Sequence, residues 1–322
     1  MSRPYCLNIE NNIYKLGDLN LMLQNKESMT YPPMDPQNPK KPFFTGVIPQ
    51  EVTINGENRR FLIYIPEHYP ISGAGFFLYP DDGVRCEEFL EQEPWKAVSE
   101  ELNAALIILE SRPGGWSRED IQSEVDYSEA VFKKAISRVY FSMNESTYYI
   151  MGLGSGAYVA TAHGLLSSSL FSCILADGDY QLNPQLLKQL GEIRSDRDVT
   201  CSKLDVAMPA WLVQREPCED DPILEKLLQA NRCEARGLSC GETAVYQQDT
   251  RRWQASLDAL PVCEVRHTAA GSAEHLDPAE LHREMMVYAL RFKRWLAIGN
   301  GCFRSARTYQ DMGLKRFEAE VD

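Results

Sequence analysis

The sequence has no long apolar stretch. No run of about 18 apolar residues occurs among its 322 positions, and a membrane-spanning helix is therefore not expected. The first twelve residues, MSRPYCLNIENN, lack the apolar core of a secretory signal peptide. We therefore expect no membrane partner. We expect a cytoplasmic location if the chain is complete at its N-terminus, and otherwise the compartment is unknown.

Positive charge is also scarce. Lysine and arginine together number 33 against 46 acidic residues, which gives a formal net charge of −13 at pH 7. A surface of this sign repels phosphate groups, which argues against a nucleic-acid or anionic-membrane partner. Hydrophobic residues make up 44% of the chain, enough for a sizeable core, and a disordered chain is thereby excluded.

The nine cysteines show no C-x-x-C pair. Without paired ligand spacing a zinc site is not expected, and no motif indicates another metal or cofactor. Six of the cysteines lie beyond residue 200. They are either free or buried thiols in a reducing compartment, or they form one or two disulfides that pin the loops there.

What the sequence does contain is a glycine-rich turn near its middle. Residues 148–162 read YYIMGLGSGAYVATA, which predicts a buried strand, a tight turn and a helix of small residues. This arrangement is typical of the nucleophile elbow, G-x-S-x-G. Gly152 and Gly156 match the outer glycines, but Gly154 stands at the nucleophile position and Ser155 follows one residue later. The spacing also differs from the G-x-G-x-x-G of dinucleotide-binding turns, and no lysine of a phosphate loop is present.

Strands and helices are predicted to alternate along the chain. The expected strands cover residues 47–54, 60–66, 75–80, 104–109, 148–151, 170–176, 207–213 and 262–269. The expected helices cover residues 94–102, 121–139, 184–193, 222–230 and 278–296. This order predicts an α/β fold with a mostly parallel central sheet and helices on both faces. The chemistry of such sheets lies at the carboxyl ends of the strands.

A catalytic histidine and acid are expected in the order nucleophile, acid, histidine. His275 lies between the last predicted strand and the last helix, and it is the predicted histidine. Asp220, in the loop after the strand at 207–213, is the predicted acid. Asp221, Glu216 and Glu219 are alternatives in the same loop, although Asp221 could instead cap the next helix. The remaining histidines fit the order less well: His68, His163, His267 and His282.

The loop that should supply an oxyanion hole is unusual. It reads Pro80-Asp81-Asp82-Gly83, and a proline has no N–H to donate. The carboxylates of Asp81 and Asp82 would raise the energy of a developing oxyanion. The second donor of an oxyanion hole would be the backbone N–H of Ser155, which follows the nucleophile position.

Taken together, residues 43–297 resemble the polyhydroxybutyrate-depolymerase and feruloyl-esterase branch of the α/β-hydrolases. The segments that carry the resemblance are VTINGENRRFLIYIP, EPWKAVSEELNAALIILE, YYIMGLGSGA and AGSAEHL. The resemblance implies a serine hydrolase of esters, often polymeric or plant-derived, with an ester or carbohydrate-linked small molecule as ligand. The resemblance implies that His275 corresponds to the catalytic histidine, Asp220 to the acid and Gly154 to the nucleophile. A glycine has no side chain and cannot form an acyl-enzyme.

Two functional hypotheses follow. The first is a degenerate, esterase-like pseudoenzyme that acts as a binding or supporting module. The second is an active carboxylesterase or depolymerase that uses Ser155. A shift of one residue on a helix turns a side chain by about 100°, which disfavours Ser155 as the nucleophile. The alternative is a structural role for Ser155, in which its hydroxyl forms hydrogen bonds at the start of the helix.

The domain organisation is predicted in three parts. Residues 1–42 form an extended, proline-rich arm, residues 43–300 form the hydrolase-like domain, and residues 301–322 form a tail. The end of the tail resembles the first strand of the domain, which indicates either a linker into a second, truncated copy or a strand packed on the same domain. A second hydrolase-like domain or a homo-oligomer is accordingly an expected partner.

Overall fold

The structure, a computed structural model, divides into two compact units. They comprise Met1–Asn144 (unit 1) and Glu145–Asp322 (unit 2). The residues that the structure describes are 29–30, 45–70, 73–136, 143–168, 170–194, 202–218, 220–233, 237–247, 264–295 and 307–310. The predicted arm and the end of the tail lie largely outside these residues, as does Glu219.

Unit 1 is built on a sheet with the strand order β1-β2-β3-β5-β4. Its strands are β1 (Met29–Thr30), β2 (Thr45–Ile54), β3 (Glu57–Ile65), β4 (Gly73–Tyr79) and β5 (Ala105–Leu109). The predicted Asn-Gly hairpin is confirmed, since Asn55 and Gly56 join β2 to β3 with φ values of 52° and 81°. β4 and β5 are parallel, and the other neighbouring pairs are antiparallel.

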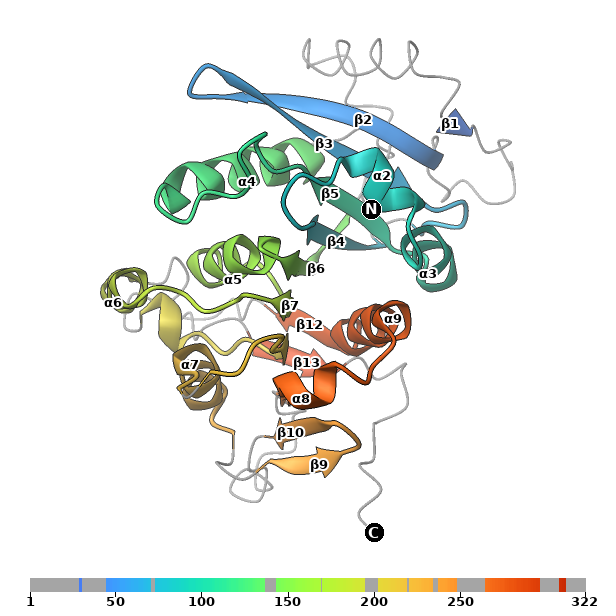
Figure 1. The fold of residues 1–322 in the computed structure, drawn as a ribbon. Coiled ribbons are helices and arrows are strands. Elements are labelled where there is room, and N and C mark those ends of the chain that lie inside the picture. The colour runs from blue at the N-terminus through green and yellow to red at the C-terminus, as the bar shows by residue number, and fades with distance from the viewer. Residues whose placement is uncertain are drawn as a thin grey trace. The chain divides into compact units, whose positions relative to one another are not determined.

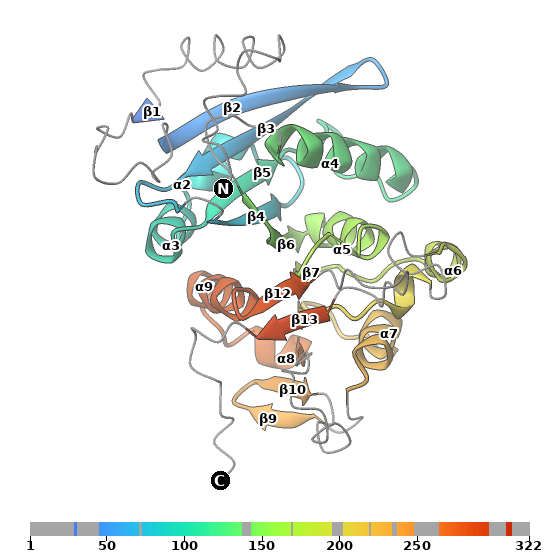
Figure 2. The ribbon, with the colours of Figure 1, turned by 180° about the vertical axis from the view of Figure 1, so that it is seen from behind.

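Three helices cover this sheet. Helix α4 (Ile121–Ile136) lies on one face, and α2 (Cys86–Glu91) and α3 (Trp95–Leu102) lie on the other (Figures 1 and 2). Strands covered on both faces must be apolar on both sides. Every residue of β5 is accordingly buried, and the aromatic side chains of Phe76 and Phe77 in β4 are completely inaccessible.

Unit 2 is built on a sheet of parallel and antiparallel strands. Its strand order is β6-β7-β8-β11-β10-β9, in which the first four strands are parallel. They are β6 (Met143–Gly154), β7 (Cys173–Gly178), β8 (Ala210–Val213) and β11 (Glu264–Thr268). β10 (Thr243–Gln247) and β9 (Leu238–Cys240) extend the sheet antiparallel.

The helices of unit 2 begin where the sequence provides start signals. Asn183, Asp221 and Asp277 cap α6 (Pro184–Glu192), α7 (Pro222–Asn231) and α9 (Pro278–Ala289), each followed by a proline at the first helical position. Helices α5 (Gly156–Leu166), α6 and α7 lie on one face of the sheet and α9 on the other (Figures 1 and 2). The predicted α/β-hydrolase fold, with a mostly parallel sheet between two helical layers, is confirmed.

The last predicted helix was wrong at its end. Helix α9 stops at Ala289, and β12 (Phe292–Trp295) then pairs antiparallel with β13 (Arg307–Gln310). Arg291 turns into the interior, where its guanidinium donates to both oxygens of Glu264 at 3.1 and 3.3 Å. The helix thus ends before this buried ion pair, although the apolar spacing continues. Helix α2 and the β9–β10 hairpin were not predicted.

None of the helices in the described part of the chain has the length and apolarity that crossing a bilayer requires.

Candidate active site

The elbow lies at the junction of β6 and α5 in unit 2. Gly154 is the last residue of β6 and has φ +55°, a left-handed conformation that glycine adopts freely and that strains other residues. Ser155 follows with φ −68° and ψ −27°, which is ordinary helical geometry, and it precedes the first residue of α5. The left-handed position of the turn is therefore occupied by Gly154, and its match to the nucleophile position of the motif stays a prediction.

Close backbone contacts explain two glycines at the elbow, Gly152 and Gly178. A Cβ on Gly152 would lie 2.4 Å from the Cα of Ala157, nearer than non-bonded atoms approach. A Cβ on Gly178, at the end of β7, would lie 2.7 Å from the Cα of Gly154. The backbone N–H of Asp179 donates to the carbonyl of Gly154 at 3.1 Å. These contacts hold α5 against the sheet and fix the turn.

His275 and Asp220 are placed on exposed loops. His275 follows the short helix α8 (Ala270–Ala273), and its backbone N–H donates to the carbonyl of Ser272 at 3.2 Å. Within the described part of the chain, the imidazole of His275 makes no hydrogen bond or ion pair, and neither does the carboxylate of Asp220. The two side chains are therefore not bonded to each other, and their roles in a triad stay a prediction.

Asp221 has the structural role that the sequence allowed. Its Oδ1 accepts from the backbone N–H of Leu224 at 2.8 Å and caps α7. Its Oδ2 accepts from the hydroxyl of Tyr180 at 2.6 Å. Both carboxylate oxygens are thus engaged, in a cap and in a link to the loop after β7.

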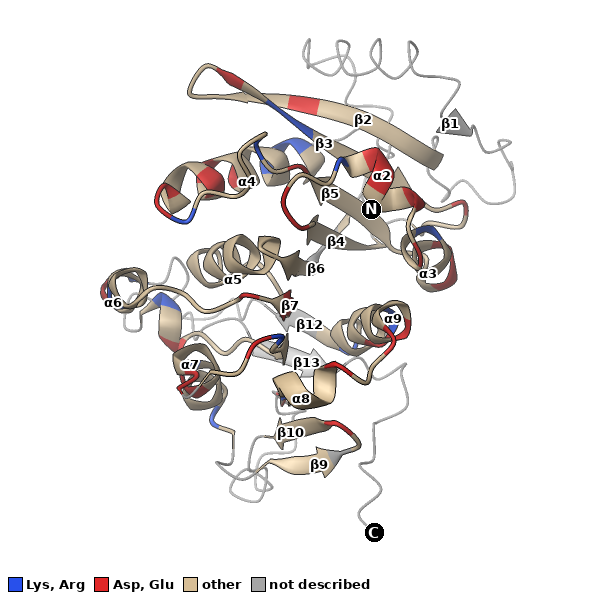
Figure 3. Ribbon diagram, in the orientation of Figure 1, with Lys and Arg blue, Asp and Glu red and all other residues tan. Residues whose placement is uncertain are grey.

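A buried ion cluster lies at the carboxyl ends of β7 and β8, and the sequence did not reveal it. Figure 3 marks the acidic and basic positions of the ribbon in red and blue, and both colours occur in unit 2. Asp177 is 5% exposed and accepts two hydrogen bonds from Arg215, the one from Nη2 measuring 2.6 Å. His282 of α9 lies with its Nε2 at 2.7 Å from Oδ2 of Asp177. Nη1 of Arg215 also donates to the carbonyl of Ala273 at 3.1 Å, which ties α8 to the cluster.

The electrostatics of Asp177 follow from these partners. Burial on its own raises the pKa of this carboxyl group, whereas the hydrogen bonds and charges of His282 and Arg215 lower it further than burial raises it. The pKa of Asp177 is therefore below its usual value, and that of Arg215 is raised by the same contact. Because Asp177 pairs in register with Val213 and Leu153 on the neighbouring strands, this fixed charge pair lies beside the elbow.

In unit 1, two backbone N–H groups of the loop after β4 already donate hydrogen bonds within the unit. The N–H of Asp82 donates to Oδ1 of Asp81 at 2.9 Å, and the N–H of Gly83 donates to the hydroxyl of Ser111 at 3.2 Å. Oδ1 of Asp82 accepts from the backbone N–H of Trp116 at 2.7 Å. Asp82 thus anchors the turn before Trp116, and these amides are not available as oxyanion donors while the bonds persist.

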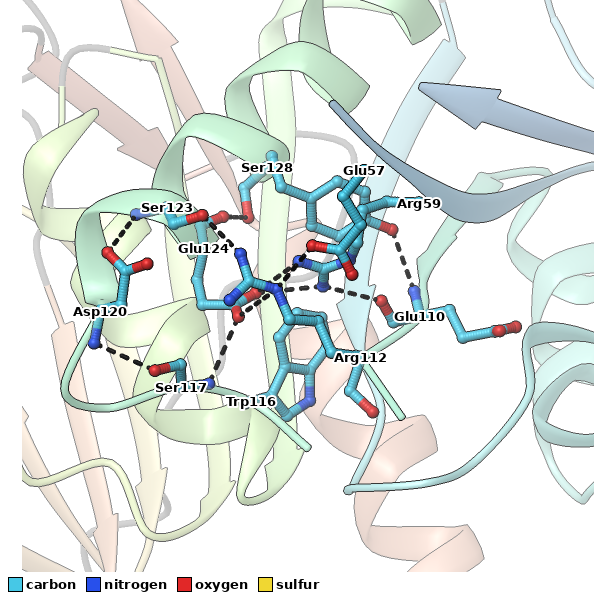
Figure 4. Close-up of polar contacts among 12 residues, drawn as sticks. Glu57, Arg59, Glu110, Arg112, Trp116, Ser117, Asp120, Ser123, Glu124 and Ser128 are labelled. Atoms are coloured by element: carbon cyan, nitrogen blue, oxygen red, sulfur yellow. Dashed lines mark hydrogen bonds and ion pairs between the residues drawn. The ribbon is translucent and has the colours of Figure 1, made fainter. Parts of the chain in front are cut away.

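A second, buried ion network lies next to the turn before Trp116 and is centred on Glu124. Oε2 of Glu124, which is fully buried on α4, accepts from Nη1 and Nη2 of Arg59 at 3.1 and 3.0 Å (Figure 4). Oε1 accepts from the N–H of Ser117 at 3.3 Å and lies 3.6 Å from Nε of Arg112. The guanidinium of Arg59 also stacks 3.9 Å from the ring centre of Tyr127. We interpret this network as structural.

Comparisons with known proteins yield similar structures only. Neither a protein-family model nor a curated protein matches the sequence. The solved structures that resemble this chain include an acetyl xylan esterase from Aspergillus awamori, with 10% identity, a TM-score of 0.46 and coverage of 69% of this chain and 92% of that one. They also include a ferulic acid esterase with 17% identity, a TM-score of 0.40 and coverage of 58% and 84%. An S-formylglutathione hydrolase from Agrobacterium tumefaciens has 17% identity, a TM-score of 0.39 and coverage of 58% and 82%. Similarity at this level transfers none of these activities to the present chain.

No group of three or more histidine, cysteine or acidic side chains suited to a metal ion occurs among the residues described.

Proposed function

We propose that this chain is an esterase-like α/β-hydrolase-fold protein that has lost its nucleophile and acts as a binding or supporting module. One observation carries the proposal: the left-handed position of the elbow is occupied by Gly154, which has no side chain. Acyl transfer needs an oxygen or sulfur nucleophile at that position. The fold therefore keeps the shape of a serine-hydrolase elbow without the attacking atom.

The backbone of Ser155 supports the same proposal. Its φ and ψ of −68° and −27° place it in the helical region at the start of α5 rather than at the strained turn. The serine nucleophile of such an elbow lies at the strained turn itself, whereas Ser155 already has the geometry of the helix.

The placement of the acid and the histidine points the same way. His275 is exposed with no side-chain hydrogen bond in the part of the chain that the structure describes, whereas the triad histidine is normally held by an acid. The buried acid of this edge, Asp177, is committed to Arg215 and His282. The ligand of such a module would be an ester or a carbohydrate-linked small molecule, and its partner a second hydrolase-like domain or another copy of the chain.

A fluorophosphonate probe tests the proposal directly. The probe forms a covalent adduct with an activated serine, and intact-mass measurement of the wild-type chain is expected to show none. The matched control is Ser155→Ala, which removes the alternative nucleophile and leaves the glycine turn unchanged. An adduct on the wild-type protein that disappears in Ser155→Ala would overturn the proposal in favour of an active carboxylesterase or depolymerase-type enzyme that uses Ser155.

A further inference from the structure

Three polar side chains from three different segments meet in unit 2, apart from the Asp177 cluster. Tyr180 lies in the loop after β7, Asp221 caps α7, and His267 belongs to β11. The hydroxyl of Tyr180 donates to Oδ2 of Asp221 at 2.6 Å, and Nε2 of His267 lies 3.7 Å from the same oxygen. Oδ2 of Asp221 therefore has two neighbouring polar groups, the hydroxyl of Tyr180 and the imidazole of His267.

Only one of the two groups is bonded to that oxygen. A separation of 3.7 Å is too long for a hydrogen bond. Nε2 of His267 is buried, and no other group in the described part of the chain bonds to it. A buried ring nitrogen without a partner is costly, and a shift of about 1 Å toward Asp221 would satisfy it.

The charge state of His267 decides which group binds. Burial lowers the pKa of this imidazole, and the carboxylate of Asp221 raises it by a smaller amount. His267 is therefore neutral at pH 7, and the Tyr180 hydroxyl holds the carboxylate. Burial and the neighbouring carboxylate raise the pKa of Tyr180, which keeps its hydroxyl protonated and able to donate.

Few other charges face His267. Its register partners on the adjacent strands are Ala244 and Leu212, which carry none. Helix α7 packs on β11 and carries Glu225 and Lys226, whose side chains are exposed to solvent. Near Tyr180, the thiol of Cys218 adds to the charges that raise the pKa of that tyrosine.

We propose that Tyr180, Asp221 and His267 form an acid-sensitive contact, in which protonation of His267 draws the Asp221 carboxylate away from Tyr180. The bond from Tyr180 is charge-assisted through its acceptor alone, whereas an imidazolium would add the attraction of its own positive charge to the carboxylate. Oδ1 of Asp221 can keep its bond to Leu224 while the carboxylate turns, so that α7 remains capped. The contact is independent of whether the chain hydrolyses any substrate.

The loop after β7 connects Tyr180 to the elbow through backbone hydrogen bonds. Tyr180 directly follows Asp179, whose backbone N–H donates to the carbonyl of Gly154, and the N–H of Tyr180 donates to the carbonyl of Gly178. Release of the Tyr180 side chain in mild acid would therefore loosen the segment that holds the turn at Gly154. We therefore infer that the mobility of the loop after β7, at the carboxyl edge of this sheet, depends on pH.

Histidine titration by NMR tests the competition for Asp221. In the full chain, the ring resonances of His267 are followed between pH 8 and pH 4.5 in wild type, Tyr180→Phe and Asp221→Asn. Tyr180→Phe frees Oδ2 for the imidazolium and should raise the His267 midpoint by about half a pH unit. Asp221→Asn keeps a capping oxygen but removes the charge, and it should lower the midpoint. Equal midpoints in the three proteins would show that the groups are not coupled and would overturn the proposal.

Amide exchange tests the consequence for the loop. The N–H of Asp179 should exchange faster below the His267 midpoint in the wild-type chain, and this acceleration should be absent in His267→Gln after correction for intrinsic exchange rates. Exchange that is equally pH-dependent in both proteins would contradict the link from His267 to the loop. This measurement on the wild-type chain remains informative even if a variant fails to fold.

Discussion

The buried histidine of α5 should make the chain sensitive to mild acid. His163 is completely inaccessible, and its ring packs edge-on against Phe171 with centroids 5.1 Å apart. Burial lowers the pKa of His163 from 6.5 to about 3, and the positive charge of Lys203 contributes in the same direction. The side chain is therefore neutral in the folded protein and charged in the unfolded protein at pH 5.

The sign and size of the effect follow from proton linkage. Between pH 6.5 and pH 3 the unfolded state binds more protons at this site than the folded state, and the free energy of unfolding therefore falls as the pH falls through that window. Each pH unit corresponds to about 1.4 kcal/mol, which gives a loss of about 2 kcal/mol between pH 7 and pH 5. Asp177 and Glu264, whose pKa values are lowered, lose their stabilisation only below the ordinary carboxyl pKa of about 4.

Urea unfolding at pH 7 and pH 5 measures this loss in wild type and in His163→Gln. Circular dichroism and tryptophan fluorescence are recorded together, because two compact units need not unfold in one transition. We expect the wild-type protein to lose about 2 kcal/mol more than the variant over this interval. His275→Gln, at an exposed histidine, is the matched control and should lose as much as the wild type. If His163→Gln loses as much as the wild type, the assignment of the acid sensitivity to His163 is refuted.

Three further substitutions, and a control for the third, test the site and the core. Gly154→Ser should fold, because a serine at φ +55° costs only about 1–3 kcal/mol of strain. The variant should react slowly with a fluorophosphonate probe, as detected by mass spectrometry. A folded variant with no adduct would show that no base serves this position. Gly152→Ala should lower the free energy of unfolding by at least about 1–3 kcal/mol, because its Cβ would overlap Ala157; unchanged urea unfolding would contradict the close packing. Glu124→Gln should cost about 3–5 kcal/mol by leaving a buried arginine without its ion pair. Glu129→Gln, at an exposed ion pair on the same helix, should change the urea-unfolding free energy by at most about 0.5 kcal/mol, and an equal loss in both would argue against the buried network.

The elements with local signals were predictable from the sequence. The Asn55–Gly56 hairpin, the elbow at Gly154 and the Pro-initiated helices of unit 2 each depend on residues within a few positions of one another. The apolar strands were found for the same reason, because burial on both faces leaves continuous hydrophobic runs. These signals were sufficient for the fold class.

Features that depend on distant partners were not predictable. Asp177 is separated from Arg215 by 38 positions and from His282 by 105, and no local pattern connects them. The end of α9 was misjudged because the apolar spacing continues to Phe292, whereas Arg291, just past the helix, pairs with Glu264 in β11. In both places the sequence gives no local sign of a distant ion-pair partner.

The shape of the elbow does not by itself indicate catalysis. Its left-handed turn is held by contacts that involve no catalytic atom: the close approach of Gly152 to Ala157, of Gly178 to Gly154, and the bond from the N–H of Asp179. A serine at φ +55° would carry strain of about 1–3 kcal/mol, which glycine avoids. Glycine at this position therefore relaxes the turn while packing preserves it, so the shape of the turn does not depend on a catalytic side chain. Activity at this turn therefore has to be measured, and the fluorophosphonate experiment with Ser155→Ala and Gly154→Ser does so.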